Sequence, residues 1–201
     1  MLQNLANNPP KTIKIFLTNG EPSGIRSLEL TGWTGKGFII PRSDLADAIR
    51  RDDLNVPAVY FLVGENEDGE QQVYVGESEN FVERIQYHNR EKDFWNTVIC
   101  FISKDETLNK AYVKYLESVL FNDVKEAKRA RVEGGRDSNP ARLSESDRAD
   151  ANEFAKNVRM LVSSTEASSA RLRPMTGWSR WMWRSTTPAP TPITSTTMAV
   201  G

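Results

Sequence analysis

The middle of the chain alternates short apolar runs with polar turns in a way that predicts a β-hairpin. Residues 57–63 read PAVYFLV and residues 73–77 read VYVGE, with the Gly-, Asn- and Asp-rich loop GENEDGEQQ between them. β-Branched and aromatic runs on both sides of such a turn are typical of two paired strands. Each predicted strand carries a tyrosine near its middle, Tyr60 or Tyr74, and the second strand ends at Gly76.

Alternation of a similar kind precedes the hairpin. Residues 12–17 (TIKIFL) alternate polar and apolar side chains, and the runs at 27–30 and 38–40 follow Gly-rich turns. We therefore predict a short N-terminal β extension of two or three strands. The segment PRSDLADAIRR, residues 41–51, predicts a short helix with Ser43 as its N-cap.

After the hairpin, the apolar spacing changes from that of a strand to that of a helix. The segment ESENFVERIQYHNREKDFW, residues 77–95, predicts a helix capped by Ser78, on which Arg84 and His88 lie four residues apart and therefore project from the same face. The run TVICFIS, residues 97–103, predicts a buried strand that partners the hairpin. The helix that Ser78 caps has an apolar stripe, which comprises Phe81, Val82 and Ile85.

A long helix follows, predicted over residues 105–130 with Asp105 or Thr107 as its cap. At ~100° per residue, Glu117 falls inside the apolar stripe of this helix. A carboxylate on an apolar face is costly unless it is paired, protonated or bound to a cation, so Glu117 is a candidate functional residue. The stripe itself comprises Val113, Leu116, Leu120 and Val124.

The last third of the chain divides into three parts. Residues 131–142 predict a polar loop, and residues 144–162 a helix capped by Ser144 with Asp147 completing a capping-box-like pair. From residue 163 to residue 201 the chain is rich in Ser, Thr and Pro, which predicts a disordered or non-native tail. Its WSRWMWR segment would be suited to stacking on nucleic-acid bases if the tail is native.

Composition narrows the class of protein. The chain has 201 residues, 38% of them hydrophobic and 26% charged, and no run approaches the ~20 apolar residues of a membrane helix. The first residues lack the features of a secretory signal, so we expect a cytoplasmic protein that does not bind a membrane. Cys100 is the single cysteine, which excludes an internal disulfide and suits a core position. The net charge of −1 gives no global reason for a polyanionic partner, although a local basic face would be enough.

Five polar residues do not fit a plain core: Tyr60, Tyr74, Arg84, His88 and Glu117. Hydrolysis of a phosphodiester needs a group that takes a proton from water, a cation that offsets charge on the phosphate, and a metal with an anionic ligand. These side chains could supply those functions together. Taken singly, each also has a structural interpretation: half-buried strand tyrosines, a solvated arginine, a structural histidine, and a glutamate paired with a lysine or arginine.

The residues Ala58-Val59-Tyr60 and Tyr74-Val75-Gly76 resemble the two halves of the GIY-YIG nuclease motif. The resemblance covers about residues 56–130. The arginine of this family is matched by Arg84, its helix Tyr or His position by His88, and its metal-binding glutamate by Glu117. The sequences around this region resemble a bacterial subgroup that carries the domain in a longer chain.

The resemblance implies an α+β fold: a small antiparallel three-stranded sheet flanked by helices in the order β-β-α-β-α, with the N-terminal β extension and a C-terminal helix added. With the segments predicted on either side of the resemblance, the chain divides into residues 1–55, 56–130, 131–162 and 163–201. It also implies a metal-dependent endonuclease that hydrolyses DNA, with RNA as an alternative substrate.

In that interpretation Glu117 is the protein ligand of one Mg²⁺ or Mn²⁺, since a hard cation prefers oxygen and keeps several waters. Tyr60 or Tyr74 positions or deprotonates the attacking water, and Arg84 clamps the scissile phosphate. His88 completes the catalytic set.

Two residues depart from the family pattern. Ala58 stands at the usual glycine, and Glu77 follows Gly76 where several relatives carry a basic residue. An acid at that position adds negative charge close to an incoming phosphate. Glu77 therefore leaves open an alternative function, a catalytically weak or inactive module that retains the fold and binds nucleic acid or another protein. The oligomeric state is not predicted.

Overall fold

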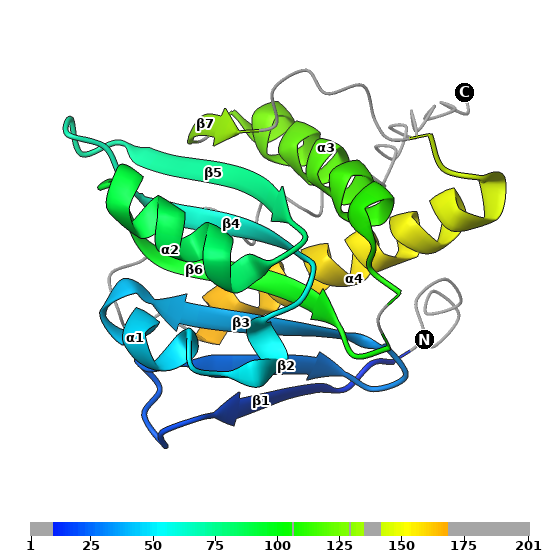
Figure 1. The fold of residues 1–201 in the computed structure, drawn as a ribbon, viewed down its shortest axis with the longest axis horizontal. Helices are drawn as coiled ribbons and strands as arrows, with labels where there is room; N and C mark the ends of the chain where they lie inside the picture. Colours follow the sequence, from blue (N-terminus) through cyan, green and yellow to red (C-terminus); the bar gives the residue numbers. More distant parts are fainter. Residues whose placement is uncertain (1–9, 106, 129, 135–141, 169–201) are drawn as a thin grey trace, which may run out of the picture.

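A single mixed sheet organises the part of the chain that the computed structural model describes, residues 10–105, 107–128, 130–134 and 142–168 (Figure 1). Within these residues the sheet has seven strands in the order β1-β2-β3-β6-β4-β5-β7. All neighbours pair antiparallel except β5 and β7, which pair parallel. The strands are β1 (Ile13–Leu17), β2 (Arg26–Leu30), β3 (Gly35–Pro41), β4 (Ala58–Glu65), β5 (Gln71–Ser78), β6 (Trp95–Ser103) and β7 (Arg131–Gly134).

The predicted hairpin is β4 and β5, and β6 pairs with β4 as expected for a partner of the hairpin. The α+β class is confirmed, but the three-stranded sheet is wrong. The other edge of β6 pairs with β3, so the N-terminal strands extend the same sheet, and Cys100 lies between Phe38 and Tyr60. The cause is the composition of β6: its apolar residues point to both faces of the sheet, and a strand of this kind is typical of a central position.

Helices cover both faces of the sheet. The apolar core on one face is closed by α3 (Lys110–Ala127) and α4 (Glu145–Ser168), and the core on the other by α1 (Leu45–Ala48) and α2 (Phe81–Glu91). Figure 1 shows α2 in front of the sheet and α4 behind it. The elements β4, β5, α2, β6 and α3 follow one another in the predicted β-β-α-β-α order. No helix in the described ranges is long and apolar enough to cross a bilayer.

The starts of α1 and α2 differ from the predictions. Residues 42–44 form a short 3-10 helix, η1 (Arg42–Asp44), and α1 then begins after Asp44 rather than from Ser43. The N-cap of α2 is Asn80, whose side chain accepts a hydrogen bond from the Glu83 amide. The Ser78 hydroxyl bonds the backbone of Asn80 instead. Each cap was predicted one or two residues too early, because several neighbouring polar residues can all cap a helix.

The caps of the later helices show the same effect. Asn109, and not Asp105 or Thr107, caps α3 by accepting from two backbone amides of its first turn. The Asp105 carboxylate accepts hydrogen bonds from the Ser103 and Thr107 hydroxyls. The predicted cap of α4 is confirmed, because the Ser144 hydroxyl accepts from the Asp147 amide at 3.1 Å.

Two segments near the end of the chain also differ from the predictions. The first residues of the predicted polar loop form β7, in which Gly134 has φ +91° and passes so close to β5 that a Cβ atom would lie 2.0 Å from the Val75 carbonyl oxygen. RVEG contains one large apolar residue, which is too few to indicate a strand. The helix predicted to end at residue 162 continues to Ser168. The rest of the predicted tail, with its Trp and Arg segment, lies outside the described residues.

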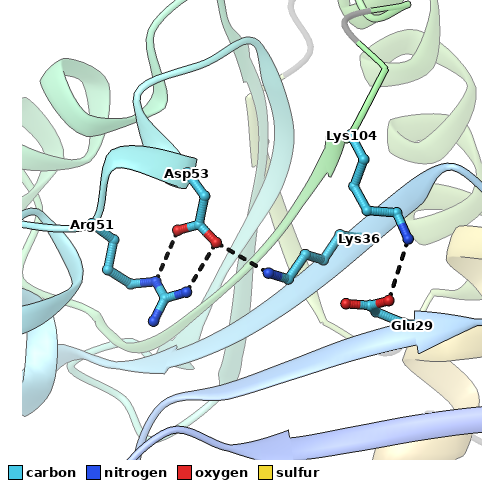
Figure 2. Close-up of polar contacts among 5 residues, drawn as sticks. All are labelled: Glu29, Lys36, Arg51, Asp53 and Lys104. Carbon is cyan, nitrogen blue, oxygen red and sulfur yellow. Dashed lines mark hydrogen bonds and ion pairs between the residues drawn. The ribbon is translucent and has the colours of Figure 1, made fainter.

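Ion pairs hold the short 3-10 helix η2 (Asp52–Leu54) on β3. Figure 2 shows the Asp53 carboxylate accepting two hydrogen bonds from Arg51, both 2.9 Å, and one of 3.0 Å from the Lys36 ammonium. Burial alone would raise the pKa of Asp53, but these two cations lower it. The same view shows Lys104 paired with Glu29 of β2 at 3.2 Å.

Candidate functional site

The two tyrosines of the hairpin lie side by side on the face of the sheet that α2 covers. Tyr60 of β4 is opposite Gly76 of β5, and Tyr74 is opposite Leu62. The two phenol rings stack, with centroids 6.2 Å apart and planes inclined by 25°. Because residues two apart on a strand point to the same face, Tyr74 and Gly76 both project toward α2.

Gly76 makes room for this stack. A Cβ atom on Gly76 would lie 2.6 Å from the hydroxyl oxygen of Tyr60 and 2.6 Å from Cε1 of Tyr74. Both contacts are shorter than real side chains tolerate, so any other residue would displace one of the rings. The glycine of the second half-motif therefore has a steric role that the sequence pattern alone does not explain.

Helix α2 brings the predicted arginine and histidine to the tyrosines. The Nε of Arg84 lies 3.3 Å from the Tyr60 hydroxyl, and its Nη2 lies 3.4 Å from the Tyr74 hydroxyl. The Nε2 of His88 lies 2.9 Å from the Tyr60 hydroxyl. The structure thus brings together four predicted residues, with the Tyr60 oxygen at the centre.

The hydrogen-bond directions at Tyr60 follow from its partners. A guanidinium can only donate, so the Tyr60 oxygen accepts from Arg84, whereas the direction of its hydrogen bond with Nε2 of His88 is set by the tautomer of the imidazole. Burial raises the pKa of Tyr60, and the neighbouring Tyr74 raises it further, against the opposing effect of Arg84. Burial lowers the pKa of His88 to about 4, with Arg84 and Lys92 adding to the effect. At neutral pH both rings are therefore uncharged.

His88 is 1% exposed, and its second ring nitrogen is unusual. Nδ1 is buried and has no hydrogen-bond partner among the described residues. Leaving such a group unpaired costs about 1–3 kcal/mol, so the packing of the surrounding rings must hold His88 in place against that cost. The rings of Tyr74 and Tyr87 pack against this imidazole at centroid distances of 4.9 and 5.8 Å.

Two charged residues that the sequence analysis missed also border Tyr74. The ammonium of Lys92 lies 4.8 Å from the centre of the Tyr74 ring and 3.3 Å from the carboxylate of Glu133. Glu133 belongs to β7 and pairs with Tyr74 in the register of the two parallel strands. Lys92 follows His88 by four residues, a spacing that could have indicated it. Glu133 lies in the predicted polar loop, where no sequence signal marked it.

Tyr87 is the exposed aromatic residue of the site. Its side chain is 45% exposed, whereas Tyr60 is fully buried and Tyr74 is half-buried. The Arg84 guanidinium lies 5.4 Å from the centre of the Tyr87 ring, within the range of a cation–π contact. Solvent therefore meets the site along Tyr74, Arg84 and Tyr87, while Tyr60 and His88 form its floor.

Glu117 is half-buried on α3, and the predicted stripe is confirmed around it, since Val113, Leu116, Leu120 and Val124 are all buried. Its negative charge is the last of the causes that raise the pKa of Tyr60, and its helix packs on the face of the sheet opposite to α2 and the two tyrosines. The described residues hold no group of three or more side chains of the metal-ligating types His, Cys, Asp and Glu. One carboxylate fits Mg²⁺ or Mn²⁺ that keeps most of its waters, and it does not fit a metal that needs a protein cage.

Glu77 gives the site an acidic neighbour on β5. It is half-buried, and burial raises the pKa of its carboxyl group, followed by the like charge of Glu79. Lys110, Arg84 and Lys114 oppose that effect. The residue therefore lies within electrostatic range of the arginine that joins the two tyrosines.

Comparisons with protein families, with curated proteins and with solved structures find no match to this chain.

Proposed function

We propose that this chain is a metal-dependent nuclease of the GIY-YIG type that hydrolyses phosphodiester bonds of DNA in the cytoplasm. The observation that carries the proposal is the hydrogen-bonded group on α2, β4 and β5, in which Arg84 reaches both phenols and Tyr60 also bonds His88. A permanent cation beside two phenols, at the solvent-facing edge of a buried polar cluster, suits an anionic substrate that must be positioned before reaction.

The phosphate would lie on Arg84, with Lys92 as a second cation beside Tyr74. The planar guanidinium of arginine matches phosphate oxygens in a bidentate way and stabilises charge that develops on them. The hydrogen bonds that hold Arg84 are long, 3.3 and 3.4 Å, so a phosphate oxygen would compete for its N–H groups with little loss. Tyr87 would stack on a base next to the phosphate, because nucleobases stack readily on exposed aromatic rings.

The two tyrosines would have different roles. Tyr60 is fully buried, and its hydroxyl is hydrogen-bonded to both His88 and Arg84, so it positions the Arg84 side chain and is not reached by water. Tyr74 is half-buried and lies between Arg84 and the Lys92 ammonium, so its hydroxyl is the one that would orient the attacking water.

Glu117 would hold the divalent ion. When bound, Mg²⁺ or Mn²⁺ would polarise the phosphate and offset negative charge at the leaving oxygen. We expect Mn²⁺ to bind the wild-type protein and to bind Glu117→Gln much more weakly, as measured by the water proton relaxation of the Mn²⁺ solution. This measurement does not depend on catalysis.

The activity is tested with supercoiled plasmid in the presence of Mg²⁺ or Mn²⁺. We expect nicking by the wild type and none by Glu117→Gln or Arg84→Ala. Glu126→Gln is the matched control, because Glu126 is exposed on the same helix and its loss should leave nicking unchanged. Equal nicking by the wild type and Glu117→Gln would refute the role of the metal.

One observation favours a second function, a nucleic-acid-binding or protein-interaction module without catalysis. Glu77 introduces negative charge within range of Arg84, where it would repel an incoming phosphate. Salt-dependent binding of DNA without cleavage under any divalent metal would support the binding module. In that case Glu77→Gln is expected to strengthen binding, and a failure to bind DNA or RNA even at low salt would leave the protein-interaction role.

A further inference from the structure

The edge strand β1 exposes apolar side chains on both of its faces. Ile15 is 44% exposed and Phe16 is 65% exposed, and the strand pairs only with β2 among the described strands. Figure 1 shows β1 along the lower border of the molecule, far from α2 and α3. An exposed apolar edge strand is a template for pairing with another strand, and proteins either protect such an edge or use it.

The hydrogen bonds of β1 show which backbone groups face outward. The Thr12 carbonyl accepts from the Thr31 amide at 3.1 Å, and the Thr18 amide donates to the Ile25 carbonyl at 3.0 Å. In an antiparallel ladder, bonding to one neighbour alternates from residue to residue. The even-numbered residues of β1 therefore bond to β2, and the odd-numbered residues 13, 15 and 17 direct their N–H and C=O groups to the open edge.

We propose that β1 pairs antiparallel with β1 of a second copy of this chain, about a two-fold axis through Ile15. In this register Ile15 pairs with itself and Ile13 pairs with Leu17 of the other copy. All three are residues whose backbone groups face outward, so about six inter-chain hydrogen bonds can form without any change to the β1–β2 ladder. An interface that uses the same patch on both copies is the usual construction of a symmetric dimer.

The side chains also complement one another in this register. On one face, the apolar residues 13, 15 and 17 of both copies form a continuous row beside Leu28 and Leu30 of β2. On the other face, Lys14 lies opposite Phe16 of the second copy. These are non-hydrogen-bonded pairs, in which side chains approach most closely, so the Lys14 ammonium can contact the Phe16 ring.

The charge on Lys14 is also available for this contact. Lys14 faces Glu29 across the β1–β2 ladder, but the ion pair of Glu29 within the described residues is with Lys104 (Figure 2). In β1 itself Lys14 is the single charged residue, so the register centred on Ile15 brings no like charges together. Pairing displaced by two residues along the strand would set Lys14 opposite Lys14 or Phe16 opposite Phe16, and the mixed pair would be lost.

The mass of the full chain in solution tests the proposal. We expect light scattering on a size-exclusion column to give twice the mass of one chain at micromolar concentration. Phe16→Lys should give a monomer, because each new lysine would face Lys14 of the other copy. Phe16→Glu, a matched change of the same residue, should keep the dimer through two opposite-charge pairs. A wild-type monomer, or a dimer that Phe16→Lys leaves intact, would overturn the proposal.

Cross-linking tests the register. A mixture of Lys14→Cys and Phe16→Cys chains should form a disulfide-linked dimer on oxidation, because non-hydrogen-bonded pairs have the separation that a disulfide requires. Lys14→Cys alone should not cross-link, and the native Cys100 is buried. Equal cross-linking by Lys14→Cys alone would refute the register. A wild-type monomer with protected amides at residues 13, 15 and 17 would show that another segment of the same chain covers the edge.

The dimer is independent of the proposed nuclease site, which lies near the other end of the sheet on β4 and β5. We therefore expect Phe16→Lys to leave plasmid nicking unchanged while it removes the dimer. Arg84→Ala is the converse variant, because we expect it to lose nicking and to keep the dimer.

Discussion

The hydroxyl group of Tyr60 occupies the space that a side chain on Gly76, its cross-strand partner, would need. A Cβ atom there would lie 2.6 Å from the phenol oxygen. That oxygen also bonds Arg84 and His88, so the backbone of β5 fixes the position of the whole polar cluster. The relationship joins the pairing of two strands directly to the chemistry proposed for the site.

Replacing Gly76 with alanine is therefore expected to damage both stability and activity. The added methyl group must displace Tyr60 or Tyr74, and overpacking of this kind costs about 1–3 kcal/mol. Denaturant unfolding measures the loss in stability, and plasmid nicking measures the loss in activity. An alanine variant with the stability and activity of the wild type would contradict the steric role of Gly76.

His88 is expected to titrate far below an ordinary histidine. It is the only histidine in the chain, so its imidazole proton signal in an NMR titration can be assigned without ambiguity. Burial, followed by Arg84 and Lys92, lowers its pKa to about 4, compared with an ordinary value of 6.5. A titration midpoint near the ordinary value would show that the ring is solvated or paired with an acid.

The same shift makes stability depend on pH. Between pH 6.5 and pH 4 the unfolded chain binds more protons at this residue than the folded chain does, so the free energy of unfolding falls as the pH decreases through that window. The loss should be on the order of 1–3 kcal/mol. His88→Gln should remove this part of the pH dependence, while the carboxylates contribute equally to both proteins. Identical slopes for the two proteins would exclude the linkage.

Substitutions of the two tyrosines should have different effects on activity and on stability. Tyr74→Phe is expected to reduce kcat about 100-fold or more with little loss of stability, because it removes the hydroxyl proposed to orient water. Tyr60→Phe leaves Nε2 of His88 without its partner, so it should cost about 1–3 kcal/mol of stability. Unfolding curves and nicking rates for both variants distinguish these roles. Loss of activity in Tyr60→Phe without loss of stability would reverse the assignment.

Glu133 should compete with the DNA for the ammonium group of Lys92. Glu133→Gln frees the ammonium group, so we expect DNA to bind a few-fold more tightly, with a steeper dependence on salt. Lys92→Met is the converse change and should weaken binding and reduce the salt slope by about one. Fluorescence anisotropy with a labelled oligonucleotide, without divalent metal, measures both. No change in either slope would show that Lys92 serves only to hold β7.

Local patterns in the sequence predicted the elements that depend on local chemistry. The hairpin, the buried strand at residues 97–103 and the apolar stripe of α3 follow from periodicity, which reports the face that a residue presents. Helix caps were predicted less well, because Ser78 and Asn80 are equally able to cap and only the packed structure decides between them. The pairing of β3 with β6 joins residues about sixty positions apart, and no local pattern specifies such a partner.

The predictions for the site divide in the same way, between features that local patterns specify and features that distant partners decide. The spacing of Arg84 and His88 on one helix face predicted that they lie together, and the hairpin predicted the same for Tyr60 and Tyr74. The sequence did not show that one phenol would be fully buried, or that β7 would bring Glu133 to Lys92. Burial and cross-strand partners are set by the complete sheet, and the strand that supplies Glu133 is four residues long with a weak pattern.

Because β6 lies at the centre of the sheet, the reactivity of the Cys100 thiol reports whether the sheet is intact. Its thiol is fully buried between β3 and β4, and burial raises its pKa, so it should not react with thiol reagents in the folded protein. Labelling requires β6 to separate from a neighbouring strand or the core above it to open. The rate of labelling therefore measures how often the centre of the sheet or the core that covers it opens, with one cysteine as the probe.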